Sequence, residues 1–189
     1  MSKLLKVSAD PIAVVAEAAE ELRSGRAVVI PTDTVYGLAV LPDNLELLYQ
    51  LKHRPQDKAV ALLVAAAGDA ETFFEPLGPT RRLMERFWPG ALTIVQDGHG
   101  VRCPDDPFVQ ALARAVGPIA TSSANLSGAP TAATAAEAGA VFPAVAVVVD
   151  GGICRSAPST VVEVTESGVT VLREGAIPAE AVRGAVAGL

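Results

Sequence analysis

The chain has 189 residues, of which 50% are hydrophobic and 4% aromatic, and its formal net charge is −6. This length and composition are typical of a globular protein with a substantial core and exclude a largely disordered chain. The acidic balance argues against a general nucleic-acid coat but is compatible with a local basic groove.

The first residues, the apolar runs and the cysteines indicate the compartment in which we expect the protein. The first residues contain no apolar segment of signal-peptide length, and no apolar run reaches the length of a membrane-spanning helix. Cys103 and Cys154 fit no zinc or redox spacing, so free thiols are expected, and a disulfide remains open. We expect a soluble, cytoplasmic protein with no membrane association.

The N-terminal part predicts strands alternating with a helix. Short apolar runs at residues 4–7 and 27–30 predict strands. Asp10, followed by a proline, predicts a helix start, and Gly25 predicts its end. Apolar residues at helical spacing are expected to face the core: Ile12, Val15, Ala16, Ala19 and Leu22.

Residues 31–38, after the second strand, are unusually polar for their surroundings. Thr32, Asp33, Thr34 and Tyr36 stand between a buried strand and a further apolar run. Small hydroxyls at the end of a strand are typical of binding crevices in α/β folds. A turn whose hydroxyls satisfy backbone groups is the alternative, and this segment alone does not decide between them.

The most basic stretch follows a helix that we expect Asp43 to cap. Lys52, Arg54 and Lys58 lie within seven residues, and Pro55 favours an extended conformation at Arg54. A loop with one guanidinium and two ammonium groups suits a polyanion such as a triphosphate. A solvated basic loop is the alternative.

The middle of the chain predicts two more strands and two helices. Strands are expected at residues 59–64 and 91–95, and helices at 69–74 and 79–87. The sequence Trp88-Pro89-Gly90 ends the second helix, and we expect its tryptophan to pack in the core.

A single arginine follows a glycine-rich segment, residues 98–104, that is expected to be flexible. Arg102 has apolar neighbours, so it is expected to be half-buried and to require an anionic partner. That partner is either Asp105 or Asp106 of the chain itself or a ligand carboxylate. His99 is interpreted as a loop residue, because two histidines provide neither a metal site nor a catalytic dyad.

A second polar segment, residues 121–128, follows a predicted helix at 106–116 and a short strand at 118–120. It offers four hydroxyls and the Asn125 amide, but the chain has neither a Walker A loop nor a nucleophile elbow. Such a segment can bind phosphate or an adenylate through hydroxyl, amide and backbone N–H groups. A polar turn with a helix cap is the alternative.

The C-terminal part predicts an antiparallel hairpin. A capping box at Thr134 opens a helix, a strand is expected at 145–149, and alternating strands are expected at 159–164 and 169–173. Pro178 opens a final helix. The sequence thus predicts one domain, residues 1–189, of the α/β class: a twisted mixed parallel/antiparallel sheet, flanked by helices, with one concave groove.

Several segments together resemble the YrdC-like threonylcarbamoyl-AMP synthases, in the family's order and over residues 10–177. The matching segments are Pro31–Leu38, Lys52–Pro55, Trp88–Gly90, Val101–Pro104, Ser123–Gly128, Ser159–Val161 and Leu172–Gly175. The extra C-terminal domain of longer relatives is absent from this sequence, so it resembles the short bacterial form. Leu63 stands where some relatives place a histidine near the threonine.

The resemblance implies an L-threonylcarbamoyladenylate synthase, a nucleotidyltransferase. Threonine and bicarbonate form a carbamate, whose oxygen attacks the α-phosphorus of ATP and releases pyrophosphate. Downstream threonylcarbamoyl-transferase proteins then pass the group to an adenosine of tRNA, and direct contact of this chain with tRNA remains open. Mg²⁺ is expected to bind through ATP, with no metal ligands from the protein.

The resemblance also implies roles for individual residues. The catalytic residues are expected to be Lys52 and Arg54. The ATP-binding residues are expected to be Lys52, Arg54, Lys58, Ser123, Asn125 and Arg173. The threonine-binding residues are expected to be Thr32, Arg102 and Ser159.

Two other functions remain open at this point. A non-catalytic RNA-binding module could use the same basic groove, and its mark would be salt-sensitive affinity for RNA. Related carbamoyl-adenylate chemistry occurs in a similar domain of hydrogenase-maturation proteins, whose zinc-finger and acyl-phosphatase modules this sequence lacks.

Overall fold

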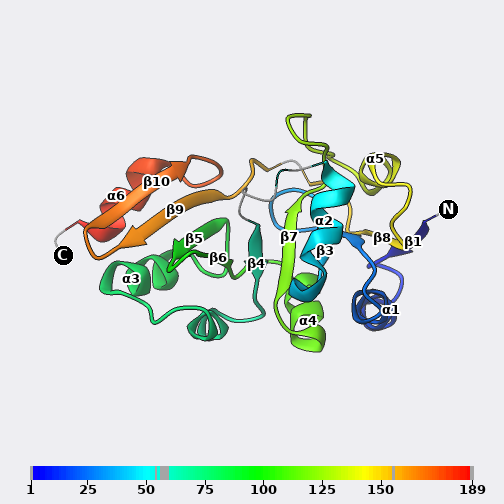
Figure 1. Ribbon diagram of the computed structural model, residues 1–189, viewed down its shortest axis with the longest axis horizontal. Coiled ribbons are helices and arrows are strands. Elements are labelled where there is room, and N and C mark those ends of the chain that lie inside the picture. Colours follow the sequence, from blue (N-terminus) through cyan, green and yellow to red (C-terminus); the bar gives the residue numbers. More distant parts are fainter. Residues whose placement is uncertain (1, 54, 56–59, 155, 188–189) are drawn as a thin grey trace.

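The strands of the protein form one open sheet that runs along the long axis of the molecule, with the two termini at opposite ends (Figure 1). The computed structural model describes residues 2–53, 55, 60–154 and 156–187. The strands are β1 (Lys3–Lys6), β2 (Val28–Ile30), β3 (Gly37–Val40), β4 (Ala61–Leu63), β5 (Leu92–Gln96), β6 (His99–Arg102), β7 (Ile119–Ser123), β8 (Val147–Asp150), β9 (Thr160–Thr165) and β10 (Gly168–Arg173).

The sheet is mixed. Within the described residues its strand order is β1-β8-β2-β3-β7-β4-β6-β5-β9-β10. The pairs β1–β8, β2–β8, β4–β6 and β5–β9 are parallel, and the remaining neighbours are antiparallel. The predicted α/β class with a mixed, helix-flanked sheet is confirmed, and so is the hairpin formed by β9 and β10.

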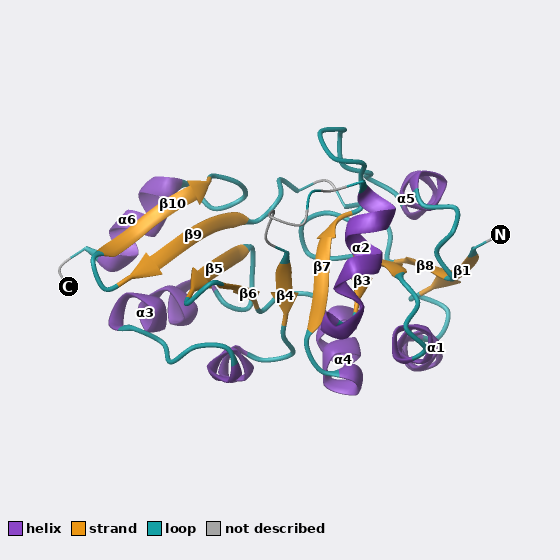
Figure 2. Cartoon of the chain, in the orientation of Figure 1, coloured by secondary structure: helices purple, strands orange, loops and turns teal. Residues whose placement is uncertain are grey.

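Helices cover most of the sheet (Figure 2). They are α1 (Pro11–Arg23), α2 (Leu45–Lys52), α3 (Gly78–Phe87), α4 (Pro107–Val116), α5 (Ala135–Val141) and α6 (Ala179–Val186), with short 3-10 helices η1 (Pro42–Asn44) and η2 (Ala67–Thr72). Figure 2 shows α3 and α6 beside β9 and β10, while α1, α2, α4 and α5 surround the N-terminal half.

Side-chain alternation assigns the helices to the two faces. Val28 and Ile30 of β2 pack in a cluster with α1 and α4, whereas Val29 between them packs in a cluster with α2 and α5. Farther along the sheet, Ile94 of β5 and Val162 of β9 pack in a third cluster with α3 and α6.

The strand register connects these clusters and leaves part of one face without a helix. Leu62 of β4, on the α2/α5 face, is paired with Val101 of β6, which belongs to the α3/α6 cluster, so these four helices share a face. On the opposite face α1 and α4 cover the N-terminal half. Over β5, β6 and β9 that face carries Thr93, Arg102 and Val161, and no helix of the described residues packs on it.

Helix α1 begins as the sequence predicts, but it buries a different stripe. The Asp10 side chain accepts a hydrogen bond from Ala13 N at 3.1 Å. The buried residues of α1 are Val14, Ala18, Ala19 and Leu22. Ile12 is 84% exposed because α1 packs against β8 and α4 along the 14–18–22 stripe, so the predicted stripe was partly wrong.

Three other expectations needed correction. Asp43 does not cap α2: it lies within η1, and the backbone enters the helix at Asn44 without a side-chain cap. A helix was expected at residues 69–74, and the structure has a 3-10 helix over residues 67–72 instead. Residues 99–102, expected to be part of a flexible segment, form β6, because a tight turn at Asp97 and Gly98, both with positive φ, pairs them with β5.

The cysteine expectation is confirmed, since Cys103 and Cys154 are free thiols. Among the described residues, no helix combines the length and apolar character needed to cross a membrane.

Candidate active site

A pocket with a volume of about 200 Å³ opens on the helix-free part of the sheet. Its walls come from both halves of the chain: the segment between β2 and β3, strands β4 to β7, and the start of β9. Five of the nine predicted site residues line it together: Thr32, Arg102, Ser123, Ser159 and Arg173. Thr34 and Thr121, which belong to the two polar segments singled out in the sequence, line it too, and so does Thr93, which no sequence signal marked.

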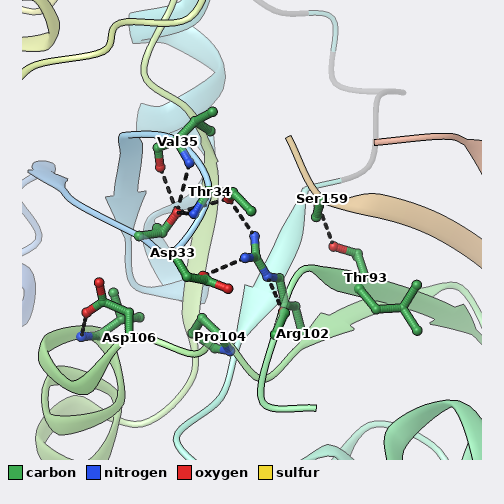
Figure 3. A network of polar contacts seen from close by, with 12 residues as sticks. Asp33, Thr34, Val35, Thr93, Arg102, Pro104, Asp106 and Ser159 are labelled. Carbon is green, nitrogen blue, oxygen red and sulfur yellow. Dashed lines mark hydrogen bonds and ion pairs between the residues drawn. The ribbon is translucent and has the colours of Figure 1, made fainter. Parts of the chain in front are cut away.

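Arg102 lies in this pocket and is held by three hydrogen bonds. Its Nε donates to Gly90 O at 2.9 Å, Nη1 to Thr34 Oγ1 at 3.0 Å and Nη2 to Asp33 Oδ1 at 2.5 Å. Figure 3 shows the guanidinium between Asp33 and Thr34, with the Asp106 carboxylate turned away towards its own helix. Of the two alternatives for its partner, a carboxylate of the chain itself is bonded to Arg102, but it is Asp33 and neither Asp105 nor Asp106.

Asp106 has a different task. Its carboxylate caps α4 by accepting a hydrogen bond from Val109 N at 3.0 Å. Burial raises the pKa of Asp106, and the charge of Asp33 adds to this, while the hydrogen bond from Val109 N acts in the opposite direction. The Asp106 carboxylate thus caps α4, and Asp33 is the carboxylate bonded to Arg102.

Thr32 combines both interpretations of the segment between β2 and β3. Its Oγ1 accepts hydrogen bonds from Thr34 N at 3.1 Å and Val35 N at 3.2 Å, and it lies 2.7 Å from Val35 O. These contacts make the turn that satisfies backbone groups, and the same residue lines the pocket. The segment is therefore both a hydrogen-bonded turn and part of the pocket wall.

The turn is anchored from behind by the segment after β8. Tyr36 is fully buried; its hydroxyl donates to Gly152 O at 2.6 Å and accepts from Gly151 N at 3.3 Å. Cys154 Sγ lies 3.4 Å from Thr32 O. Burial raises the pKa of Tyr36 to about 12, so its hydroxyl stays protonated and acts as a structural donor.

On the C-terminal side of the pocket, Ser159 lies in a hydroxyl-rich corner. Its Oγ is hydrogen-bonded to Thr93 Oγ1 at 2.9 Å, and Arg173 Nη2 donates to Ser159 O at 2.8 Å. Thr160 fixes this corner: its Oγ1 donates to Ile177 O at 2.6 Å and accepts from the N–H groups of Gly175 and Ile177.

The Ser123–Asn125 segment is tied to the end of α2 by Lys52. The Lys52 side chain is buried, and its Nζ donates to Ser123 O and, at 2.8 Å, to Asn125 O. Ser123 Oγ donates to Asn125 Oδ1 at 2.5 Å, and Asn125 Nδ2 donates to Ala129 O at 2.5 Å. Ser123 lines the pocket, whereas Lys52 and Asn125 are not among its lining residues.

Two predicted residues, Arg54 and Lys58, lie outside the described residues. His53, just before them, adopts a left-handed conformation that ends α2, and its backbone N–H bonds Gln50 O at 3.2 Å. Helix α2 therefore ends at the lysine that holds the Ser123–Asn125 segment.

The pocket is suited to binding an anion and a polar ligand side by side. Guanidinium groups of Arg102 and Arg173 face it together with hydroxyls of threonine and serine. Burial raises the pKa of the Cys103 thiol to about 11, so this neighbour of Arg102 is no thiolate nucleophile at neutral pH. Among the described residues, no three His, Cys, Asp or Glu side chains gather as a metal site.

Comparisons with known proteins agree with this arrangement. The family model Sua5_yciO_yrdC, described as "Telomere recombination", matches residues 20–175. A Bacillus subtilis protein named threonylcarbamoyl-AMP synthase is 34% identical over 91% of this chain, which spans 56% of that relative. A Mycobacterium tuberculosis relative is 37% identical over 84% of this chain and 82% of its own length.

A solved structure extends the likeness to three dimensions. P. abyssi Sua5 complexed with L-threonine superposes with a TM-score of 0.87 at 27% identity, over 99% of this chain and 61% of that one. The family model covers most of the chain, and the segments that line the pocket fall within it. The chain therefore belongs to the Sua5/YciO/YrdC family.

Proposed function

We propose that the chain is an L-threonylcarbamoyladenylate synthase, which converts ATP, L-threonine and bicarbonate into threonylcarbamoyl-AMP and pyrophosphate. The observation that carries the proposal is the pocket of this family member, where Arg102 and Ser159 on one side face Ser123 on the other. Relatives named threonylcarbamoyl-AMP synthase and the threonine complex of P. abyssi Sua5 support it.

The threonine end of the pocket is assigned to Thr32, Arg102 and Ser159. A guanidinium is the side chain best suited to a carboxylate, because its planar N–H groups match the two oxygens. Arg102 is held at the pocket by bonds to Gly90 and Thr34. The turn at Thr32 and the hydroxyl of Ser159 then bracket the amino-acid ligand.

The nucleotide end is assigned to Ser123, Asn125 and Arg173 together with the basic stretch Lys52, Arg54 and Lys58. These groups would bind the triphosphate and stabilise charge on the departing pyrophosphate. Lys52 donates to backbone carbonyls of the Ser123–Asn125 segment, so we assign it the positioning of that segment. Direct contact of Lys52 with phosphate stays a prediction.

The reaction needs little covalent help from the protein. The threonine nitrogen bonds to the carbon of bicarbonate with loss of water, and the resulting carbamate oxygen bonds to the α-phosphorus of ATP. The bond from the α-phosphorus to the bridging oxygen breaks, and that oxygen leaves with pyrophosphate. Holding the carbamate and the phosphate in line is the task of the pocket.

Mg²⁺ would reach the site on the phosphates of ATP, since this ion keeps most of its ligands from water and phosphate. The product would be consumed by a threonylcarbamoyl-transferase protein that modifies an adenosine of tRNA. The anionic, activated carbamoyl–phosphate linkage requires such an acceptor, and this chain would act before it.

The test is pyrophosphate release from protein, ATP, Mg²⁺, bicarbonate and L-threonine, with each component omitted in turn. We expect release to require both threonine and bicarbonate, and Arg102→Ala to abolish it while Arg114→Ala, an exposed arginine on α4, does not. Release without threonine would contradict the assignment. Salt-sensitive RNA binding without any release would favour a non-catalytic RNA-binding module.

A further inference from the structure

We propose that Asp33 is a positioning residue for the substrate carboxylate: it orients the Arg102 guanidinium so that the remaining N–H groups of Arg102 face the pocket. Asp33 Oδ1 and Arg102 Nη2 lie 2.5 Å apart. The inference rests on the proposed function, because the carboxylate concerned is that of L-threonine.

The bonds to Arg102 leave a defined set of donors. A guanidinium has five N–H groups, and three of those of Arg102 bond Gly90, Thr34 and Asp33, one from each nitrogen. One N–H on Nη1 and one on Nη2 therefore remain beyond these bonds. Two donors on neighbouring nitrogens of a rigid plane are the arrangement that a carboxylate binds.

Among the three groups that accept hydrogen bonds from Arg102, Asp33 carries the charge, and the Asp33–Arg102 ion pair is shielded from water. The side chains of Arg102 and Asp33 are 6% and 13% exposed, respectively. The bond to Asp33 Oδ1 is the shortest of the three at 2.5 Å, against 2.9 Å to Gly90 O and 3.0 Å to Thr34 Oγ1. The position of this acceptor oxygen therefore sets the orientation of the guanidinium about its long axis.

The backbone around Asp33 is itself prearranged. Thr32 Oγ1 accepts the N–H groups of Thr34 and Val35, which closes the turn that contains Asp33. The Tyr36 hydroxyl then ties the end of this turn to Gly151 and Gly152. Asp33 can consequently hold Arg102 from the turn before β3, although β7 and β4 lie between β3 and β6 in the sheet.

The nearby carboxylate of Asp106 does not duplicate this role. It accepts Val109 N at the start of α4, 3.0 Å away, and is turned from Arg102 in Figure 3. Asp105 is exposed and supplies a matched control with the same change of charge in the same part of the molecule.

Two substitutions distinguish the effect of the position of the Asp33 acceptor oxygen from the effect of its charge. Asp33→Asn keeps an acceptor oxygen at the same place and removes the charge, whereas Asp33→Glu keeps the charge and displaces the oxygen by one methylene. We would measure the Kd of L-threonine by calorimetry without ATP, and the KM values of threonine and ATP from pyrophosphate release. Asp105→Asn serves as control.

A positioning role predicts a threonine Kd within about threefold of wild type for Asp33→Asn and at least about tenfold weaker for Asp33→Glu, because small displacements of a binding group are costly. The KM of ATP and the Asp105→Asn control should stay unchanged. Equal threonine affinity in both variants, or loss in Asp33→Asn with retention in Asp33→Glu, would overturn the inference. Wild-type protein that binds no threonine would instead remove the proposed function, and this inference with it.

Discussion

The ammonium of Lys52 lies 2.8 Å from the backbone carbonyl oxygen of Asn125 and joins the end of α2 to the segment that follows β7. The same nitrogen also donates to Ser123 O and approaches Asn125 Oδ1 at 3.4 Å. A lysine this deeply buried must be compensated by such acceptors. The position of the Ser123 hydroxyl in the pocket thus depends on a side chain 71 residues away in sequence.

Lys52→Met should weaken ATP binding more than threonine binding. Methionine has similar length but no donor, so the Ser123–Asn125 segment loses its tie to α2. We expect the KM of ATP to rise by roughly tenfold or more, because a displaced binding segment loses orientation, while the KM of threonine changes little. Steady-state pyrophosphate release measures both. Lys6→Met, at an exposed position of β1, is the control, and an equal rise in both KM values would contradict this role.

Thr160→Val should destabilise the fold. Its Oγ1 bonds Ile177 O at 2.6 Å, Gly175 N at 2.9 Å and Ile177 N at 3.1 Å, and valine has the same shape without these contacts. Leaving buried backbone groups unpaired costs about 1–3 kcal/mol in the free energy of unfolding. Urea denaturation checks this against Thr165→Val, an exposed threonine of β9, which should stay within about 0.5 kcal/mol of wild type.

Gly175→Ala should damage both stability and the threonine site. A Cβ there would lie 2.1 Å from Pro158 O and 2.8 Å from Ser159 C, so the backbone carrying Ser159 must move. Gly184, in α6, has nothing within 4 Å of its Cβ position. Gly184→Ala should stabilise the protein by about 0.5–1 kcal/mol. Calorimetric threonine affinity and urea denaturation of both variants measure the contrast, and equal behaviour would contradict it.

Asp106→Asn should stabilise the protein at neutral pH and lose this advantage in acid. Burial raises the pKa of Asp106 above its usual range, so the folded state favours the protonated form. The native state then binds more protons than the unfolded state, and stability falls as pH rises through this range. Asparagine keeps an N-cap oxygen for Val109 N without the charge.

The measurement for Asp106 is the free energy of unfolding at pH 4 and pH 7. The variant should gain on wild type from the lower to the higher pH. Asp106→Ala, which also removes the cap, should be about 1 kcal/mol less stable than Asp106→Asn at both pH values. A variant whose difference from wild type is independent of pH would contradict the role assigned to burial.

Local sequence signals predicted much of this fold, because their causes lie within a few residues. The Asp10 cap, the capping box at Thr134 and the β9–β10 hairpin all appear where expected. Strand β6 was missed because its sequence, His-Gly-Val-Arg, has too few apolar side chains to show a pattern. Asp43 does not cap α2 because it lies inside the 3-10 helix η1, which precedes α2.

The site was predictable in its residue types and not in its pairings. The polar segments that follow β2 and include β7 stood out because hydroxyls interrupt apolar runs. The Asp33–Arg102 bond spans 69 residues, and only the strand order brings its partners together. Thr93 was missed because a single hydroxyl inside a strand gives no signal until Ser159 is placed opposite it.

The most direct test of the proposed synthase is the product itself. We would incubate the protein with ATP, Mg²⁺, L-threonine and ¹³C-labelled bicarbonate and analyse the nucleotides by mass spectrometry. The account predicts an AMP adduct that carries threonine and one ¹³C, formed with one pyrophosphate and absent from the Arg102→Ala variant. ATP turnover that leaves only unlabelled AMP or ADP would contradict it.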